Sequence, residues 1–180
     1  MKKKRALDKA WEAAQKEFRH LSVDHLAELA KSPDADKRLL ALALMKRQIR
    51  LGDNPTYYFG LGRKLVGDPD NNCRWQSLIV IADLIESEPD LVWEVIGEFG
   101  DSDDDDMRMA IATILLEHLL DHDFDRYFPK VQEEIRNKRY RFIDTLENCA
   151  LDGRDGPNHK KAQSYLRNAK RGLNRNQWGG

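Results

Sequence analysis

Three aligned stretches decide the fold of this chain: DADKRLLALALMKRQI at residues 34–49, DNNCRWQSLIVIADLI at 70–85 and DDDMRMAIATILLEHL at 104–119. They align without a gap, and their starts are 36 and 34 residues apart. Each begins with Asp and has Arg at its fifth position, which gives the pairs Asp34 and Arg38, Asp70 and Arg74, and Asp104 and Arg108. A self-match at such a period predicts stacked, repeated helical units.

Each stretch predicts a long helix, because its apolar residues recur at steps of three and four. The expected long helices cover about residues 36–51, 71–86 and 104–121, and each is followed by a turn and a shorter helix. Sustained period-two alternation, which is typical of strands, is absent from the sequence. An earlier helix is expected over about 4–20 from the stripe Leu7, Ala10, Trp11, Ala14, Phe18 and Leu21.

The C-terminal third predicts shorter elements. Phe128 and Pro129 indicate a helix boundary, so the next helix is expected to start at Pro129. A further helix is expected near 140–150, followed by a short helix near 158–171 and a loose tail. We therefore predict a helical repeat domain over residues 1–150 and a basic C-terminal helix and tail over 151–180.

The repeated Asp and Arg predict a role in stacking. A carboxylate at a helix start accepts from free backbone N–H groups and complements the helix dipole. The Arg lies one turn later and can reach an Asp of its own or of the next unit. We expect a ladder of such pairs to hold the units in register, with a small contribution from each exposed pair. Trp75 aligns with Leu39 and Met109 in an apolar column, which predicts a core position.

The Asp-x-x-x-Arg opening, the alanine- and leucine-rich helix and the shorter second helix together resemble HEAT repeats over about residues 34–120. The stretch LLEHLLDHDFDRYFPKV (115–131) further resembles a group of uncharacterised bacterial HEAT-like proteins. The resemblance implies an all-α fold, a right-handed superhelix of four to five helix pairs. It implies no particular activity, since such superhelices mostly serve as binding surfaces.

The net charge of −1 hides a strong segregation of charge along the chain. Basic residues outnumber acidic ones by six in residues 1–80 and by seven in 126–180, whereas acidic residues dominate 81–125 by fourteen. An acidic middle attracts basic partners and repels nucleic acid. We therefore predict a non-catalytic module that binds a basic protein through an acidic face. The candidate residues are Asp83, Glu86, Glu94, Glu98, Asp101, Asp103, Asp104, Asp105 and Asp106.

No motif in the sequence predicts a cofactor. His118 and His122 share the spacing that places two zinc ligands on one helix face, but Leu119 stands where a zinc protease has Glu. The run Asp103 to Asp106 lacks the glycine of a calcium loop. Gly60 and Gly62 lack the spacing of a phosphate-binding loop. We expect neither a metal nor a cofactor, and we expect no enzyme activity.

Two alternatives stay open at this stage. Some HEAT-like superhelices are alkylpurine DNA glycosylases, and a comparable site here would use Trp75, Trp93 and Asp83. The other alternative is nucleic-acid binding by the basic ends, with Tyr165 and Trp178 stacking on bases. Its cations would be Lys2, Lys3, Lys4, Arg5, Lys160, Lys161, Arg167, Lys170, Arg171 and Arg175.

The chain is expected to work in the cytoplasm. Cys73 and Cys149 lie far apart, form no metal or redox motif and are expected to pack in or near the core. The basic start MKKKRALDKAWEAA has no apolar stretch after it, so it does not resemble a secretory signal. No apolar run approaches the length of a membrane span, and we expect no membrane partner.

Overall fold

The structure is a computed structural model, and it describes residues 23–52, 54–137, 139–151 and 156–177, with side chains up to residue 171. Within these ranges it contains nine helices and no β-strand, when the continuous helix of residues 105–122 counts as one. The all-α class predicted from the sequence is confirmed. The helix expected over about 4–20 lies outside the described residues.

The described helices follow one another in the predicted order along the chain. They are α2 (Val23–Ala30), α3 (Ala35–Arg50), α4 (Pro55–Lys64), α5 (Asn71–Ala82), α6 (Pro89–Phe99), α7 (Asp105–Ala110), the π-helical segment η2 (Ile111–Leu116), α8 (Glu117–His122), α9 (Phe124–Arg136), α10 (Phe142–Glu147) and α11 (Pro157–Gln177). The long helices α3 and α5 begin where the repeat predicts, and α5 ends about four residues early.

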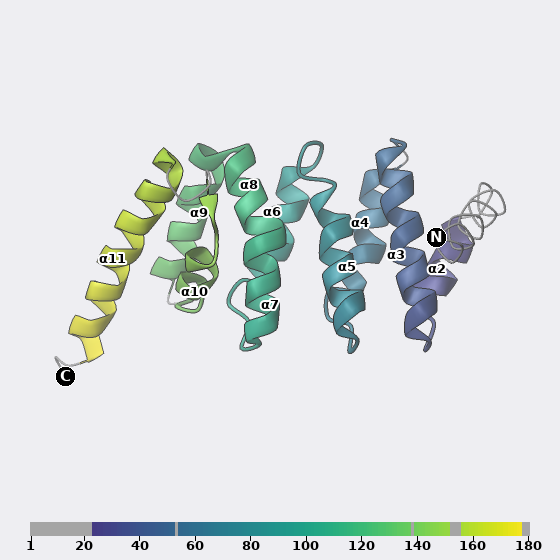
Figure 1. Cartoon of the computed structure of the whole chain (residues 1–180), viewed down its shortest axis with the longest axis horizontal. Coiled ribbons are helices and arrows are strands. Elements are labelled where there is room, and N and C mark those ends of the chain that lie inside the picture. Colours follow the sequence, from purple (N-terminus) through teal and green to yellow (C-terminus); the bar gives the residue numbers. More distant parts are fainter. Residues whose placement is uncertain (1–22, 53, 138, 152–155, 178–180) are drawn as a thin grey trace, which may run out of the picture.

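The helices stand side by side in a row that follows the order of the sequence from α2 to α11 (Figure 1). α3 packs on α5, and α5 packs on η2, so the three aligned stretches are neighbours in space. The shorter α4 contacts both α3 and α5, and α6 contacts η2 and α8. One cluster of buried apolar side chains runs through the row. Each helix therefore buries its apolar face against its neighbours along the chain.

The third long helix departs from the other two through its π-helical segment. Residues 105–122 form one continuous helix, but η2 in its middle makes wider turns than an α-helix. Thr113 donates its hydroxyl to the carbonyl of Met109 at 2.9 Å within this helix. The wider turns shift the register of α8 relative to α7. The gapless alignment of the three stretches therefore holds at the helix starts better than at the ends.

The predicted boundary at Pro129 is wrong, because α9 runs through it from Phe124. Asp123 caps this helix by accepting from the backbone N–H of Arg126 at 3.1 Å. The buried stripe of α9 continues on both sides of the proline and consists of Phe124, Tyr127, Phe128, Val131 and Ile135. Pro129 itself is exposed, so water can reach the carbonyl that its missing N–H leaves free. Packing of the stripe outweighs the cost of the proline.

The last two helices also differ from their predicted lengths. α10 covers only Phe142–Glu147 of the expected 140–150. α11 is a 21-residue helix that continues to Gln177, beyond the expected end near 171. Its apolar residues Ala162 and Leu166 are buried, and α11 packs on α10. Part of the expected loose tail is therefore helical.

Gly97 in α6 and Gly100 directly after it give a test of the packing, because alanine has opposite effects at the two positions. A Cβ at Gly100 would lie 2.7 Å from the Ile96 carbonyl oxygen and would overlap the ring of Phe142, whereas a Cβ at Gly97 meets nothing within 4 Å. We expect Gly100→Ala to destabilise the protein by about 1–3 kcal/mol. We expect Gly97→Ala to stabilise it by about 0.5–1 kcal/mol, because alanine favours the helix.

Chemical denaturation of both variants and the parent chain measures these free energies. A stability loss of similar size for both variants would contradict the described packing of α6 against α10.

Candidate functional site

The three aligned aspartates cap the starts of α3, α5 and α7. Asp34 accepts from the backbone N–H of Asp36 at 3.0 Å, and Asp70 accepts from that of Cys73 at 3.0 Å. Asp104 accepts from the N–H groups of the second and third residues after it, at 2.9 and 3.4 Å. The predicted capping role is confirmed. The three helix starts lie along one side of the row, which we name the N-terminal edge.

The three aligned arginines share a second interaction that the sequence reading did not identify. Each donates its Nη1–H to the backbone carbonyl six residues before it, namely Ser32 for Arg38 at 2.8 Å, Asp68 for Arg74 at 3.4 Å and Ser102 for Arg108 at 2.6 Å. The guanidinium therefore closes the turn that leads into its own helix. This contact is the same in all three units.

The residue two before each cap completes the motif. Its side-chain oxygen accepts a hydrogen bond from the backbone N–H of the cap. Ser32 accepts from Asp34 at 3.2 Å, Asp68 from Asp70 at 2.9 Å, and Ser102 from Asp104 at 3.1 Å. The repeat is therefore Ser/Asp-x-Asp-x-x-x-Arg. The signal was visible in the sequence as a small polar acceptor at residues 32, 68 and 102.

Arg38 also reaches the next unit. Its Nε and Nη2 donate to the two carboxylate oxygens of Asp68 at 2.7 and 2.9 Å, and both side chains are buried. The Asp68 carboxylate raises the pKa of Arg38 above its ordinary value. This forked ion pair joins the start of α3 to the turn before α5.

The other two arginines approach the following unit more loosely. Arg74 lies 3.8 Å from Asp104 and 3.6 Å from Asp106. Arg108 lies 3.9 Å from Asp144 and forms a close contact with Asp105 of its own helix. Of the Asp and Arg residues predicted to form a ladder, only Arg74 and Asp104 pair between neighbouring units. Arg38 and Arg108 reach other carboxylates instead.

The nine carboxylates proposed to bind a partner occupy three separate places. Asp83 and Glu86 lie at the end of α5, at the opposite edge of the row from the caps. Glu94 and Glu98 lie on α6, where both pair with Arg63 of α4, at 2.9 and 2.7 Å. The remaining five lie in and beside the turn before α7: Asp101, Asp103, Asp104, Asp105 and Asp106. The nine residues therefore share no single surface.

Every one of the nine carboxylates has a basic side chain of this chain nearby. Asp83 pairs with Arg50 at 3.0 Å, and Glu86 lies 3.6 Å from His122. In the turn before α7, Asp101 lies 3.8 Å from Arg139. Most of these pairs connect residues 30–40 positions apart in sequence. The acidic middle of the chain is thus compensated largely by its own basic flanks, which sequence counting could not reveal.

The turn before α7 keeps an excess of negative charge after this pairing. We name its five carboxylates the acidic edge: Asp101, Asp103, Asp104, Asp105 and Asp106. The four arginines that approach it are Arg74, Arg108, Arg139 and Arg141, and Arg108 also faces Asp144. The side chains of Asp103 and Asp105 are 86% and 90% exposed. Carboxylates therefore outnumber cations here.

Apolar side chains border the acidic edge. Met109 is 41% exposed, and it lies one helical turn after Asp105 and Asp106 on α7. Trp75 of α5 is only partly buried and donates its indole N–H to Asp106 at 3.1 Å. The expectation that the column of Leu39, Trp75 and Met109 is core is wrong for Met109 and only partly right for the others. These residues face the side of the row rather than its centre.

The three residues proposed for a glycosylase site do not converge. Trp75 and Asp83 lie at opposite ends of α5, about 12 Å apart along the helix axis. Asp83 is engaged by Arg50. Trp93 lies on α6, beside the ring of Tyr127 at 6.1 Å between centroids. Asp83 lines an open groove at the ends of α5 and α8, and neither Trp75 nor Trp93 is among the residues that line this groove with it.

His118 and His122 lie with Asp83, Glu86 and Asp121 around an open groove between the ends of α5 and α8. Within the described ranges, no group of three or more His, Cys, Asp or Glu side chains has the geometry to hold a metal ion. This groove therefore supplies no candidate metal centre.

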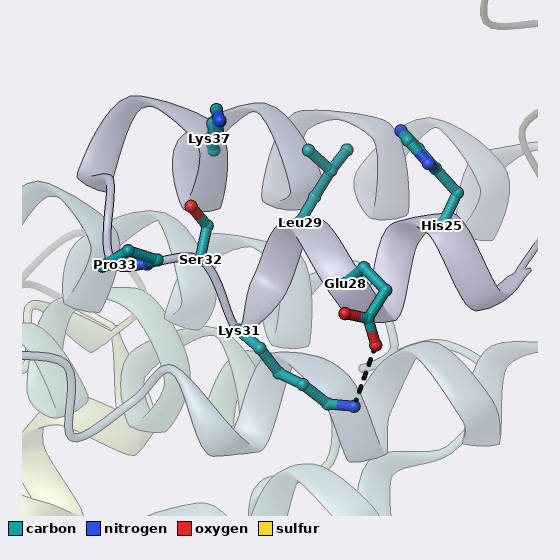
Figure 2. Close-up of a pocket in the computed structure, with 7 residues that line it drawn as sticks. All are labelled: His25, Glu28, Leu29, Lys31, Ser32, Pro33 and Lys37. Atoms are coloured by element: carbon teal, nitrogen blue, oxygen red, sulfur yellow. Dashed lines mark hydrogen bonds and ion pairs between the residues drawn. The ribbon is translucent and has the colours of Figure 1, made fainter.

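A second open groove lies between α2 and the start of α3 (Figure 2). Its lining residues are His25, Glu28, Leu29, Lys31, Ser32, Pro33 and Lys37. His25, Leu29 and Ser32 point to one side of α2, whereas Glu28 and Lys31 point to the other and pair at 3.3 Å (Figure 2). The groove brings together no nucleophile with an adjacent base.

Both cysteines are buried, as predicted. Burial raises the pKa of the Cys149 thiol well above the ordinary value for cysteine. It also raises the pKa of the Cys73 thiol above that value. Cys149 lies 3.5 Å from the carbonyl oxygens of Ala112 and Thr145. A protonated, enclosed thiol is a poor nucleophile, so the geometry assigns packing rather than chemistry to these residues.

A cluster around Asp90 joins α6 to α9, and sequence reading missed it. The Tyr127 hydroxyl donates to Asp90 at 2.9 Å, and Arg126 and Lys130 lie 2.6 and 3.4 Å from the same carboxylate. The Tyr127 bond holds the pKa of Asp90 below its ordinary value. Lys130 also lies over the rings of Trp93 and Tyr127. The cluster is structural, since it connects neighbouring units.

This cluster predicts a pH dependence through Tyr127. Burial, reinforced by Asp90, raises the pKa of Tyr127 to about 12. The unfolded phenol ionises near pH 10, so this stabilisation is complete below about pH 10 and is lost as pH rises towards 12. We expect alkaline ultraviolet titration to show a phenolate step near pH 12 that Tyr127→Phe abolishes. Tyr140→Phe, at an exposed position, should leave the step in place.

The basic C-terminal residues lie on α11 as far as the structure describes their side chains. Lys161 lies 3.9 Å from Asp125, and Lys170 pairs with Glu147. Tyr165 packs edge-on against Phe128, and its hydroxyl donates to the Gln132 carbonyl at 3.3 Å. Tyr165 is thus held in the row by these contacts, and base stacking by its partly buried ring stays a prediction. Lys2, Lys3, Lys4, Arg5 and Trp178 lie outside the described residues.

Comparisons with known proteins leave the family open. No protein-family model matches this chain, and searches of curated proteins and of solved structures return no significant match. Within the described part of the chain, no helix combines the length and the apolar character needed to cross a membrane. The fold of the described residues defines an all-helical protein whose helices pack in a row.

Proposed function

We propose that this chain is a HEAT-like right-handed superhelix that acts as a non-catalytic module and binds a basic protein partner at the acidic edge. The sequence repeat and the row of packed helix pairs support the superhelix. A superhelix of this kind presents a long surface assembled from neighbouring units. The proposal assigns no chemical step and no cofactor to the chain.

The observation that carries the proposal is the position of the acidic edge beside the exposed side chain of Met109 and the partly buried ring of Trp75. Asp103 and Asp105 are almost fully exposed, and Met109 and Trp75 lie next to them. A protein interface combines an apolar centre with a charged rim, and charge complementarity speeds association. The acidic edge therefore fits a partner segment that carries Lys or Arg around one or two apolar residues.

The other carboxylates of the original acidic set play no part in this proposal. Glu94 and Glu98 are held by Arg63, and Asp83 is held by Arg50. The side chains of Glu94, Glu98 and Asp83 are 51%, 48% and 20% exposed, whereas Asp103 and Asp105 keep 86% and 90% of their surface accessible to a partner. The proposal therefore places binding at the middle of the N-terminal edge.

The test compares partner capture by the parent chain and by Asp103→Asn/Asp105→Asn. These two side chains are the most exposed of the acidic edge, and neither caps a helix. The captured protein is purified, and its dissociation constant is measured for each variant by calorimetry. We expect a basic protein whose affinity falls at least tenfold for the variant, since close charge pairs at interfaces contribute substantially.

The matched control is Asp24→Asn/Glu133→Gln, which changes the net charge equally at exposed positions on α2 and α9. It should leave the dissociation constant within about twofold, as expected for charges away from an interface. Equal losses for the two variants, or a captured partner that is acidic, would contradict the proposal.

A further inference from the structure

α11 is the longest described helix, and every charge that it carries is basic. Residues 156–180 hold six basic residues and no acidic one. Elsewhere in the row, basic and acidic side chains of neighbouring units pair with each other, as Arg63 does with Glu94 and Glu98. On α11 only Lys161 and Lys170 have acidic partners among the described residues. Lys160, Arg167 and Arg171 are exposed and have none.

The unpaired cations lie on one line along the helix. Lys160, Ser164, Arg167 and Arg171 follow one another at steps of four, three and four residues, and all four are exposed. This spacing keeps them on one face, which we name the basic stripe. The stripe extends about 16 Å along the axis of α11. It points away from the buried residues Ala162 and Leu166 on the opposite face.

We propose that the basic stripe binds the phosphate backbone of a nucleic-acid duplex, independently of the partner site at the acidic edge. Three unpaired cations on a rigid helix can contact several successive phosphates, because a duplex carries about one charge per 1.7 Å of its axis. Ser164 and Asn168, which flanks the stripe, add neutral side chains that hydrogen-bond phosphate oxygens. α11 lies at the end of the row, so no further described helix covers this face (Figure 1).

The chemistry of the stripe favours a duplex over the two competing ligands. A membrane-bound helix inserts apolar side chains beside its basic ones. The apolar residues of α11 are instead packed into the row, with Tyr165 against Phe128. Single strands bind through stacking on exposed aromatic rings. The described side chains of the stripe include no such ring, so the backbone of a duplex is the better match.

The test is a fluorescence-anisotropy titration of the full chain with a labelled DNA or RNA duplex of mixed sequence. We expect the logarithm of the association constant to fall linearly with the logarithm of the salt concentration. Three phosphate contacts predict a slope of about −3. Arg167→Gln/Arg171→Gln should weaken binding at least tenfold and reduce the slope by about 2. Arg167→Lys/Arg171→Lys keeps the charges and should keep most of the affinity.

The matched control is Lys37→Gln/Lys64→Gln, which removes two exposed cations from α3 and α4. It should change the affinity for the duplex less than about threefold, because salt screens the attraction between the phosphates and cations that lie far from the basic stripe. An equal loss of duplex affinity in both glutamine variants would overturn the proposal, since it would show that the duplex is attracted by the overall positive charge and not by the basic stripe. Absence of duplex binding at low salt, or binding to phosphatidylserine vesicles with none to the duplex, would also overturn it. Circular dichroism establishes that each variant remains folded.

Discussion

Asp68→Ala is expected to lower the melting temperature by roughly 6–15 °C, the largest effect of any single charge change in this chain. The change leaves the Arg38 guanidinium buried beside the core without its forked partner. It also removes the acceptor for the backbone N–H of Asp70, the cap of α5. Both losses occur between α3 and α5, so the variant loosens two neighbouring units at once. Thermal unfolding followed by circular dichroism measures the shift.

Asp103→Ala is the matched control, because it removes an exposed partner of Arg141 at the same edge. We expect its melting temperature to change by less than about 2 °C, as exposed ion pairs stabilise little. The double variant Arg38→Met/Asp68→Leu should recover part of the loss, since an apolar pair can replace a buried ion pair. A loss below about 2 °C for Asp68→Ala would show that the buried pair does not hold these units together.

Leu115→Ala is expected to lower the free energy of unfolding by about 2–5 kcal/mol, through lost burial and the cavity left behind. Leu115 is fully buried in η2, and that segment packs against α5, α6 and α10. One truncated side chain therefore weakens contacts with several units in the middle of the row. Urea unfolding with linear extrapolation provides the measurement.

Leu51→Ala is the control for the same substitution, because Leu51 is 68% exposed in the turn after α3. Its effect should stay within about 0.5 kcal/mol. If the two substitutions destabilise the protein equally, the core does not run continuously through η2.

The features predicted correctly from the sequence are local ones. The capping role of Asp34, Asp70 and Asp104 follows from contacts within three residues, and the helix starts follow with it. Apolar spacing likewise predicts the all-α class and the positions of α3 and α5. The proline rule failed at Pro129 because the apolar stripe of α9, which lies against its neighbours, decides the helix there.

Features that depend on distant residues were not predictable in the same way. Arg38 reaches Asp68, thirty positions away, and the aligned residues in the other units are Ser32 and Ser102. The π-helical segment leaves no period in the sequence that distinguishes it from an α-helix. The charge count indicated an acidic middle, but only the fold shows which of its carboxylates are already paired with arginines.

Pairing between units gives the segregated charges a structural role. The basic flanks of the chain lie beside its acidic middle once the helices stand in a row, as Arg50 with Asp83 and Arg126 with Asp90 illustrate. Such pairs set the register of neighbouring helices and suppress wrong pairings more than they add stability. The acidic edge and the basic stripe keep uncompensated charge, and each has its own proposed ligand.

The central claim, that a basic partner lies against the acidic edge, is tested most directly by photo-crosslinking in cells. A benzophenone amino acid is placed at residue 109, beside the acidic edge, and in a second variant at residue 133, on the exposed side of α9. The account predicts a crosslinked adduct with a basic protein from residue 109 and none from residue 133. Adducts from residue 133 alone, or an adduct from residue 109 with an acidic protein, would contradict it.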